Sequence, residues 1–600
     1  MRKKLLLVSG ILLRSWDTLI CFEILYKTLG HSFVFPYIRS LLESIPRKLG
    51  FAYLSQQNIG LVLRSPAALL TLAAVLLLLA FYLLFETVAL LEYCEAGWRR
   101  QRIMLWGMCK RGLTCTAGLF RPKRVAVLLF LPALLLSVFS FASGWLRTVH
   151  VPEFILEHIW GTPPLALLYA VVLSACNLML FCYMFGLPSM LLGGASFPAS
   201  CRESRRLLKG KKLRLFGGLL WGAALLLLVF SCLTAIAVLI SAGYAKLAYG
   251  PEQGRALFRL TLLTVQRSGG IAAGVFASVL LCAAVLTMYH AYRGDARPKP
   301  LSAGRGGWGQ AARRTAFVVF SVMLLVFAGE SELGGAFSAA TELRPKIVAH
   351  RAGGAFAPEN TVAALEQAIA DGADEAEIDV QQLRDGTLIV LHDTNFKRTA
   401  GLHAAVWDTD YAAVKELDNG SYFSPAYAGE PVATLDEMLR AAKGRIGLMI
   451  ELKATGHERA LEQETLALIR SHGMEGQCGV ASMNLDILRR VKAQAPEIQT
   501  VYISAILISD RYDLQFLDGY SVETTSLSAE TVSNAHMQGK KVYGWTANTE
   551  KNLAKLLRYG VDGVLTDNVL LAQYAFQAEG ENMLVDWLTG MLFPDEAGAA

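Results

Sequence analysis

EAEIDVQQLRDGTLIVLHD, residues 375–393, is the stretch that decides the fold of the carboxy-terminal part of this chain. AEIDV and TLIVLH have the apolar and β-branched composition of two successive strands. Glu377 and Asp379 are two residues apart, so both side chains point to the same face of the first strand. His392 and Asp393 end the second run. The stretch therefore predicts strands that carry ionisable side chains to one place.

Strand and helix patterns alternate along the chain on both sides of this stretch. The alternation continues for about 230 residues, which predicts parallel βαβ units closed into a TIM-type (β/α)8 barrel. We expect the barrel at 345–578, after a linker at 334–344 and before a carboxy-terminal tail at 579–600. Residues 394–432, rich in Tyr, Asp, Gly and Pro, interrupt the rhythm and indicate an insertion. The other predicted strands are KIVAH (346–350), IGLMIEL (446–452), CGVAS (478–482), TVYIS (500–504), SVETTS (521–526), KVYGW (541–545) and GVLTD (563–567).

Ionisable residues gather at the ends of four strand segments, and in such barrels the carboxyl ends of the strands build the active site. Glu451 and Lys453 have the same two-residue spacing as Glu377 and Asp379. The carboxylates of Glu377, Asp379 and Glu451 would form a cage of hard oxygen ligands that suits Mg²⁺ or Ca²⁺. Without a cation they would repel one another, so the pattern predicts a bound divalent metal ion.

Two histidines and two cations supply the remaining chemistry of phosphodiester cleavage. One histidine can deprotonate the nucleophile while the other protonates the leaving alkoxide. We therefore expect His350 and His392 to be catalytic. Arg351 and Lys453 provide positive charge for the non-bridging phosphate oxygens, so we expect them to bind the substrate.

Some of these residues also have a structural interpretation. Arg351 could pair with Glu359 instead of contacting phosphate. Glu359 could bind substrate, or it could open a helix together with the two capping residues that follow it. Trp545 could line the substrate pocket or belong to the core, and Asp567 could be structural. We expect the other histidines of this part to be surface residues: His403, His457, His472 and His536.

Five strings in this order resemble the glycerophosphodiester phosphodiesterase family over essentially the whole soluble part. They are AHRAGGAFAPENT (349–361), EAEIDVQQLRDGTLIVLHD (375–393), IELK (450–453), VYGWTAN (542–548) and DGVLTDN (562–568). The resemblance implies a TIM-type barrel, a divalent cation, and hydrolysis of glycerophosphodiesters to sn-glycerol 3-phosphate and an alcohol. The family string has Gly directly after His-Arg, where this chain has Ala352, a departure that could shift the loop over the phosphate.

Matched motif by motif, the resemblance implies site roles for seven residues of this chain. Basic loops and apolar runs ahead of such a domain are also similar to the membrane-anchored bacterial members of that family. The seven residues are His350, Arg351, Glu377, Asp379, His392, Glu451 and Lys453.

The first half of the chain has the composition of a multi-pass α-helical membrane domain, which we place at 1–333. Of all residues in the chain, 54% are hydrophobic and only 18% are charged, whereas soluble proteins carry about 25% charged residues. A membrane-crossing helix needs about 20 apolar residues. The run at 15–42 is interrupted by charged residues and could instead be re-entrant or interfacial. The seven expected spans are 15–42, 66–91, 125–146, 164–192, 215–244, 270–292 and 315–331.

The distribution of Lys and Arg predicts the orientation of this membrane domain. Basic residues cluster at 98–124, 202–214 and 293–314, whereas 150–163 has neither Lys nor Arg. Cytoplasmic loops carry the excess of Lys and Arg, so these three loops are expected in the cytoplasm. With a retained cytoplasmic amino terminus, the last span then exits, and the barrel lies on the extracytoplasmic face of a bacterial cell membrane.

The sequence thus predicts an integral membrane enzyme that acts on a glycerophosphodiester or a substrate derived from a glycerophospholipid. The net charge of +7 does not indicate nucleic-acid binding, because the basic residues lie in short loops beside apolar runs. A membrane transporter or sensor with a non-catalytic ligand-binding barrel is the alternative, and a barrel that forms a cyclic phosphate is another. The oligomeric state is left open.

Overall fold

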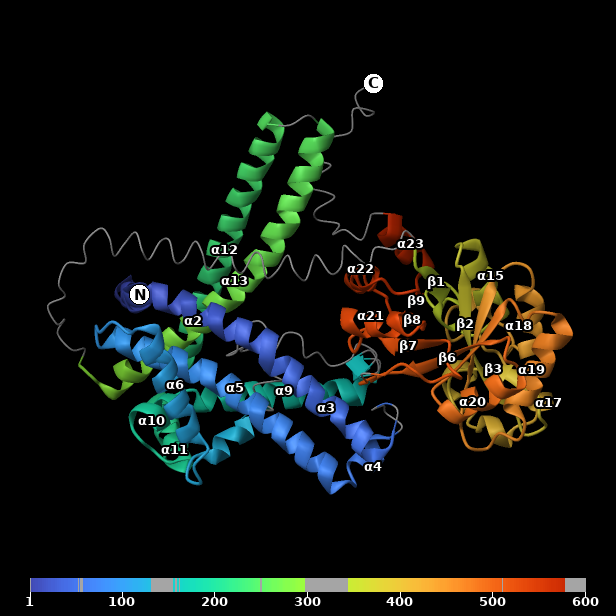
Figure 1. The fold of residues 1–600 in the computed structure, drawn as a ribbon, viewed down its shortest axis with the longest axis horizontal. Helices are drawn as coiled ribbons and strands as arrows, with labels where there is room; N and C mark the ends of the chain where they lie inside the picture. Colours follow the sequence, from blue (N-terminus) through green and yellow to red (C-terminus); the bar gives the residue numbers. More distant parts are fainter. Residues whose placement is uncertain are drawn as a thin grey trace. The chain divides into compact units, whose positions relative to one another are not determined.

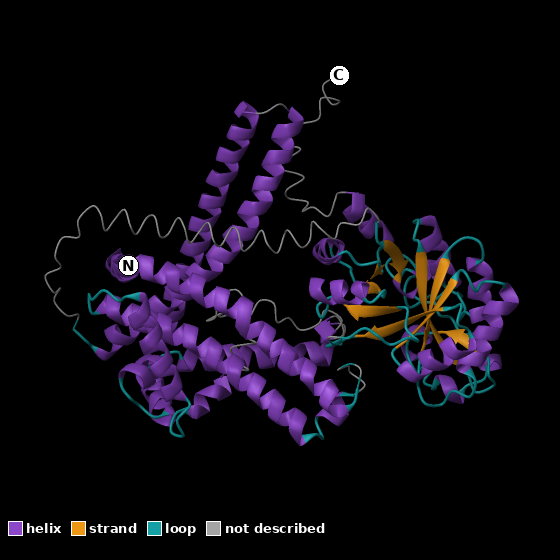
Figure 2. Ribbon diagram, in the orientation of Figure 1, coloured by secondary structure: helices purple, strands orange, loops and turns teal. Residues whose placement is uncertain are grey.

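The computed structural model describes residues 2–577 except 52, 54–57, 131–154, 157, 158, 161, 249, 250, 297–343 and 510. The chain divides into two compact units. One unit comprises Met1–Leu42, Leu69–Ser331 and Met583–Ala600, and the other comprises Glu43–Ala68 and Glu332–Asn582. The described part of the first unit is helical, whereas the second contains the β-sheet (Figure 1, Figure 2).

Long apolar helices dominate the described residues up to 293. A π-helical turn, Gly30–Val34, joins α2 to α3. The helices α12 and α13 lie side by side (Figure 1), and Ala242 and Ala245 of α12 pack against Phe258 and Leu262 of α13. The helices are α1 (Arg2–Leu12), α2 (Trp16–Leu29), α3 (Phe35–Leu49), α4 (Ile59–Val62), α5 (Pro66–Trp98), α6 (Leu105–Leu119), α9 (Pro163–Tyr183), α10 (Gly186–Leu192), α11 (Phe197–Leu208), α12 (Lys212–Ala248) and α13 (Pro251–Arg293).

Four helical segments among the described residues are long and apolar enough to cross a membrane. They are Pro66–Trp98, Pro163–Leu192, Lys212–Ala248 and Phe276–Arg293, and they coincide with four of the seven expected spans. The expected span at 15–42 is helical, but the π-helical turn Gly30–Val34 divides it, and it is not among the four. Of the span at 125–146, only residues 125–130 are described, and the span at 315–331 lies outside the described residues.

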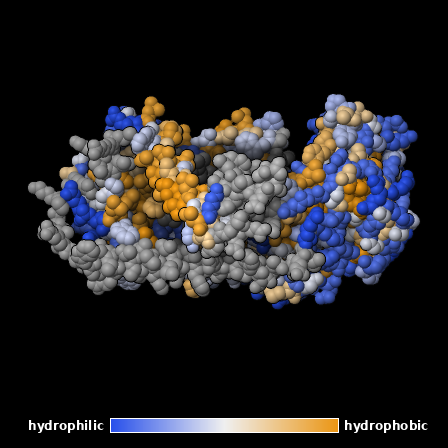
Figure 3. Space-filling model, turned by 90° about the horizontal axis from the view of Figure 1, so that it is seen from above, coloured by the Kyte–Doolittle hydropathy of each residue, from blue (hydrophilic) through white to orange (hydrophobic). Residues whose placement is uncertain are grey.

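The surfaces of the two units differ in the way their compositions predict. Hydrophobic residues (orange) cover wide areas of the helical unit, whereas the visible surface of the barrel unit is mainly hydrophilic (Figure 3). In α12, Leu227 and Leu239 expose 70% and 66% of their surface. Such exposure is costly in water but normal for a helix that faces lipid. The first unit is therefore built for an apolar solvent.

The second unit contains a closed barrel of eight parallel strands, as the sequence predicts. The strands follow the order β1-β9-β8-β7-β6-β5-β4-β2, and β1 pairs with β2 to close the ring. The ninth strand, β3, runs antiparallel to β2 at the edge. The strands are β1 (Lys346–Ala349), β2 (Glu375–Gln382), β3 (Leu388–Val390), β4 (Gly447–Leu452), β5 (Cys478–Ser482), β6 (Gln499–Ser504), β7 (Gly519–Glu523), β8 (Lys541–Trp545) and β9 (Gly563–Thr566).

Short polar side chains start the helices that cover the barrel. Thr361 caps α15 by accepting a hydrogen bond from the Ala364 amide at 3.1 Å. Thr434 and Glu437 form a reciprocal capping box at the start of α18. The expected insertion at 394–432 holds only single turns of helix. The covering helices are α15 (Val362–Ala370), α18 (Leu435–Ala442), α19 (Leu461–His472), α20 (Leu485–Gln494), α21 (Ala529–Met537), α22 (Glu550–Tyr559) and α23 (Val569–Gln577).

The alternating side chains of the strands separate two apolar clusters. Val348, Met449, Val501 and Leu565, from strands around the ring, belong to one cluster that fills the barrel centre. Their sequence neighbours belong to a larger cluster shared with the covering helices. This alternation follows from the two-residue period of a strand.

Tyr53 fills a gap in the ring of covering helices. Residues 505–509 and 511–518, which connect β6 to β7, contain no helix. Tyr502 and Tyr520 on these two strands face the outer cluster, and Tyr53 packs on them with ring centroids 5.8 and 5.6 Å away. The hydroxyl oxygens of Tyr53 and Tyr520 are 2.5 Å apart. A segment far away in the sequence therefore completes the barrel unit, which the sequence did not indicate.

We expect Tyr53→Ala to lower the free energy of unfolding of the barrel by about 3 kcal/mol, because it removes a buried aromatic ring. Tyr53→Phe keeps the ring and removes only the hydroxyl contact, so it should cost about 1 kcal/mol. Thermal unfolding of the full-length protein in detergent measures both changes. A barrel transition of Tyr53→Ala that coincides with that of the unaltered protein would contradict this account.

Candidate active site

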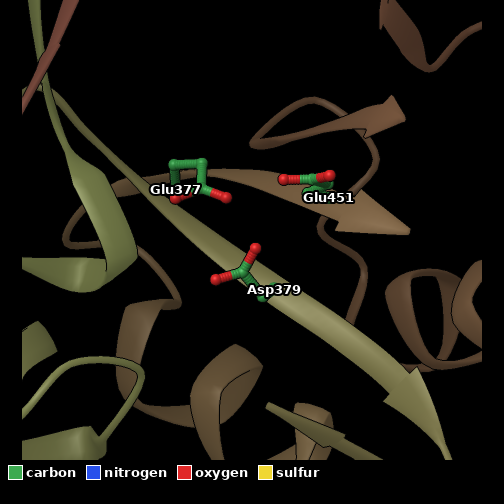
Figure 4. A group of neighbouring side chains, drawn as sticks. All are labelled: Glu377, Asp379 and Glu451. Atoms are coloured by element: carbon green, nitrogen blue, oxygen red, sulfur yellow. The ribbon is translucent and has the colours of Figure 1, made fainter. Parts of the chain in front are cut away.

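Three carboxylates converge at the mouth of the barrel. Strands β2 and β4 run parallel with Asp379 opposite Glu451, and Glu377 lies two residues before Asp379 on the same face. Oxygen atoms of the three side chains lie within 4.8 Å of one another. Figure 4 shows the carboxylates of Glu377, Asp379 and Glu451 turned toward one common space. All three residues are buried, so the structure brings together the group that the strand spacing predicts.

The charges of this cluster are only partly compensated by the protein. Burial and the charge of Asp379 raise the pKa of Glu377 to about 8. The Nζ atom of Lys453 lies 2.7 Å from Oδ1 of Asp379 and 2.9 Å from Oε2 of Glu451. Although burial opposes it, this lysine helps to hold the pKa of Asp379 well below its usual range. Three carboxyl groups thus share the ammonium of Lys453, with Arg351 no nearer than 4.0 Å to Asp379, and this donor set fits a hard divalent ion.

The loop after β1 holds two of the carboxylates in place. The Arg351 amide donates to Oε2 of Glu377 at 2.9 Å. Asn360 donates from Nδ2 to Oδ2 of Asp379 at 2.7 Å and accepts from the Asp379 amide at 3.1 Å. Ala352 has a φ of 63°, a left-handed conformation that glycine adopts freely. That backbone explains why a glycine suits this position, and alanine holds the same turn at a cost of about 1 kcal/mol.

His350 forms a His–Asp pair on one side of the cluster. Its Nδ1 atom lies 2.7 Å from Oδ1 of Asp567, which follows β9. Asn548 fixes Asp567 by donating to Oδ2 at 2.5 Å and accepting from the Asp567 amide at 2.9 Å. Burial alone would lower the pKa of His350, but the carboxylate of Asp567 outweighs burial and raises it. With Nδ1 bound to Asp567, Nε2 of His350 is left for proton transfer.

His392 forms the second His–Asp pair by a route that the sequence did not predict. The run TLIVLH makes the antiparallel strand β3 instead of a barrel strand, because it folds back along β2. Val390 pairs with Val380, and the Leu391 amide donates to the Asp379 carbonyl at 2.8 Å. The return brings His392 to the level of Asp379. Its Nδ1 atom lies 3.0 Å from Oδ1 of Asp393.

Arg351 and Glu359 form an ion pair next to the carboxylates. Nη1 of Arg351 lies 2.9 Å from Oε1 of Glu359, and its Nε lies 4.0 Å from Oδ2 of Asp379. Both interpretations of the Glu359 segment are therefore partly right, because Thr361 caps α15 while Glu359 faces the site. Arg398, from the insertion, also binds Glu359. The sequence analysis did not single out Arg398. The only related signal in the sequence is Asp393, directly after His392, to which Arg398 also donates.

The remaining predicted residues lie apart from the carboxylates. Trp545 ends β8, donates from its indole to the Ser521 carbonyl at 3.1 Å, and packs against the barrel-centre cluster. This placement favours its core interpretation. The other histidines pair elsewhere or lie on the surface: His457 stacks on Trp407, His472 pairs with Asp436, His536 pairs with Asp562, and His403 is exposed.

Comparison with known proteins identifies both halves of the chain. Residues 350–571 match the model of the glycerophosphoryl diester phosphodiesterase family, and residues 8–328 match the model of the membrane domain of glycerophosphoryl diester phosphodiesterase. The chain belongs to this family. The resemblance seen in the motifs is confirmed, and so is the expectation of an enzyme, because the family consists of phosphodiesterases.

Individual relatives match the barrel part alone. YhdW of Bacillus subtilis is 32% identical over 227 residues, which are 37% of this chain and 93% of YhdW. The glycerophosphodiester phosphodiesterase of Caldanaerobacter subterraneus is 29% identical over 231 residues, 38% of this chain and 95% of that protein. A phosphodiesterase structure from Oleispira antarctica, solved with sn-glycerol 3-phosphate, is 29% identical, covers 40% of this chain and 99% of that one, and has a TM-score of 0.36.

We expect Asp567→Asn to lower the pKa of His350, because a neutral amide no longer stabilises the imidazolium. The limb of the pH profile of kcat/KM that reports His350 should therefore move to lower pH, by about one unit. Asp436→Asn is the matched control, since it removes the carboxylate 2.8 Å from His472 outside the site. An unmoved profile in Asp567→Asn would show that this carboxylate does not tune His350.

Proposed function

We propose that this membrane-bound phosphodiesterase uses a divalent cation and two histidines to hydrolyse glycerophosphodiesters to sn-glycerol 3-phosphate and an alcohol. The observation that carries the proposal is the arrangement of three buried carboxylates between two His–Asp pairs at the barrel mouth. A binding module needs neither a proton-transfer pair nor clustered buried acids. The family to which the chain belongs supports the same reaction class.

The donor set supports a resident cation at Glu377, Asp379 and Glu451. Mg²⁺ and Ca²⁺ both prefer carboxylate oxygens. Burial, and then repulsion from Asp379, raise the pKa of Glu377 to about 8, and a cation would relieve that repulsion. When bound, the ion would polarise a phosphate oxygen and help neutralise its charge. Restoration of activity after chelation determines which metal ion the enzyme uses.

The two His–Asp pairs supply an acid and a base. One imidazole takes the proton of the attacking water, and the other delivers a proton to the leaving alkoxide. Asp567 and Asp393 each occupy Nδ1 of their histidine, so Nε2 is the atom that exchanges protons with the reactants. Asp567 outweighs burial and raises the pKa of His350, which favours the protonated ring.

The positive groups at the mouth contact the phosphate in this proposal. Arg351 and Lys453 lie next to different oxygen atoms of Asp379 and offer donors to the non-bridging oxygens. Glu359 contributes by orienting the Arg351 guanidinium. Trp545 at the end of β8 is left out of this set, because its contacts favour a core residue.

We expect the purified full-length protein to release sn-glycerol 3-phosphate and choline from glycerophosphocholine. A chelator should abolish the activity, and Mg²⁺ or Ca²⁺ should restore it. Phosphorus NMR identifies the product and separates hydrolysis from formation of a cyclic phosphate. If the protein binds glycerophosphocholine but does not hydrolyse it with either Mg²⁺ or Ca²⁺ present, the proposal is refuted and a sensor or transporter is favoured.

The same assay tests the two histidines. His350→Ala and His392→Ala should each lower kcat by about 10²–10⁴-fold, the usual contribution of general acid–base catalysis. His536→Ala is the control, because its ring pairs with Asp562 away from the site. Full activity in both site variants, with folding unchanged, would remove their assigned roles.

We also place the barrel on the extracytoplasmic face of the cell membrane. The three basic loops support this side by the positive-inside rule. The compact unit that contains the barrel also includes Glu43–Ala68, so both must lie on one face. With a cytoplasmic amino terminus and one crossing at 15–42, residue 43 lies outside the cytoplasm. This is the same side on which the three basic loops and the following crossings place the barrel.

We expect a phosphatase reporter fused after Ala600 to be active, because alkaline phosphatase folds only outside the cytoplasm, where its disulfides can form. A fluorescent-protein reporter at the same position should stay dark if export prevents its folding. The opposite result with both reporters would invert the orientation and place the substrate in the cytoplasm.

A further inference from the structure

Arg398 connects two parts of the active site that come from different loops. It lies in the single-turn helix α16 (Lys397–Ala400) at the start of the insertion. Its guanidinium donates to Asp393 from Nε at 2.8 Å and from Nη2 at 3.1 Å. It donates to Glu359 from Nη1 at 2.9 Å and from Nη2 at 2.6 Å. Both carboxylates are thus bound by two donors of one planar group.

Each of these carboxylates has a second partner in the site. Oδ1 of Asp393 accepts from Nδ1 of His392, and Oε1 of Glu359 accepts from Nη1 of Arg351. One continuous chain of hydrogen bonds therefore runs from His392 through Asp393, Arg398 and Glu359 to Arg351. A residue outside the motif strings joins the proton-transfer group to the phosphate-binding group.

The charge count shows what Arg398 contributes. Without it, Glu359 would keep only the cation of Arg351 and Asp393 only the ring of His392, which would leave more negative charge beside an anionic substrate. With it, two cations balance two anions. Burial would raise the pKa of both carboxyl groups, but Arg398 together with Arg351 lowers that of Glu359, and His392 together with Arg398 lowers that of Asp393.

We propose that Arg398 is a positioning residue of the phosphodiesterase reaction, which orients His392 through Asp393 and Arg351 through Glu359. The proposal rests on the roles of His392 and Arg351 proposed above. It assigns two separable effects to one side chain. The planar fork fixes the imidazole for proton transfer, and the positive charge leaves Arg351 available to the phosphate.

Three variants of the full-length protein separate these effects, with glycerophosphocholine as substrate and saturating Mg²⁺. Arg398→Ala should lower kcat/KM by about 10–100-fold, as outer partners of a metal site do. Arg398→Lys keeps the charge without the fork, so KM should return toward the normal value while kcat stays low. Arg384→Ala is the matched control, because Arg384, in the turn between β2 and β3, binds Asp410 of the insertion with two donors.

Chemical rescue with added guanidinium separates a positioning role from a purely structural one, because a structural defect would not be repaired by it. We expect it to restore part of the kcat of Arg398→Ala and to leave Arg384→Ala unchanged, with equal melting temperatures for the two variants. Kinetics of Arg398→Ala equal to those of Arg384→Ala, or a loss that guanidinium does not restore, would overturn the proposal. An unaltered protein without activity would overturn the proposed function and this inference together.

Discussion

The site depends on keeping three carboxylates together where water has little access. The parallel register of β2 and β4 sets Asp379 opposite Glu451, and the two-residue period adds Glu377 on the same face. Like charges in such a place repel one another and favour protonation. Surrounding donors reduce this repulsion. The ammonium of Lys453 and the amide of Asn360 bind Asp379, and the backbone N–H of Arg351 binds Glu377. The last of these contacts lies in the left-handed turn after β1.

The parts of this arrangement that depend on local periodicity could be predicted from the sequence. Strand spacing alone indicates that Glu377 and Asp379 share a face, and the alternation of strands and helices indicates a parallel barrel. The long apolar helices α5 and α12 are equally local signals, because length and composition decide whether a helix can span a membrane. These features needed no knowledge of distant contacts.

The parts that were missed depend on residues far apart in the chain or on ambiguous short segments. His350 and Asp567 are 217 positions apart, so no local pattern pairs them. The strand composition of TLIVLH does not reveal its direction, and only the turn back along β2 makes it antiparallel. Glu359 and Thr361 both suit the start of a helix, yet one faces the site and the other caps α15. In each of these cases the sequence is compatible with two structures, and the packing of the folded chain selects one of them.

The place of Tyr53 has a consequence for how the protein is made. Its hydroxyl partner, Tyr520, is synthesised 467 residues later. At about 5–20 residues per second, the interval between the two on the ribosome is about 20–90 s. During that time Tyr53 lacks the rings of Tyr502 and Tyr520 on which it packs. The outer barrel wall at this place therefore cannot be completed until β7 has been synthesised.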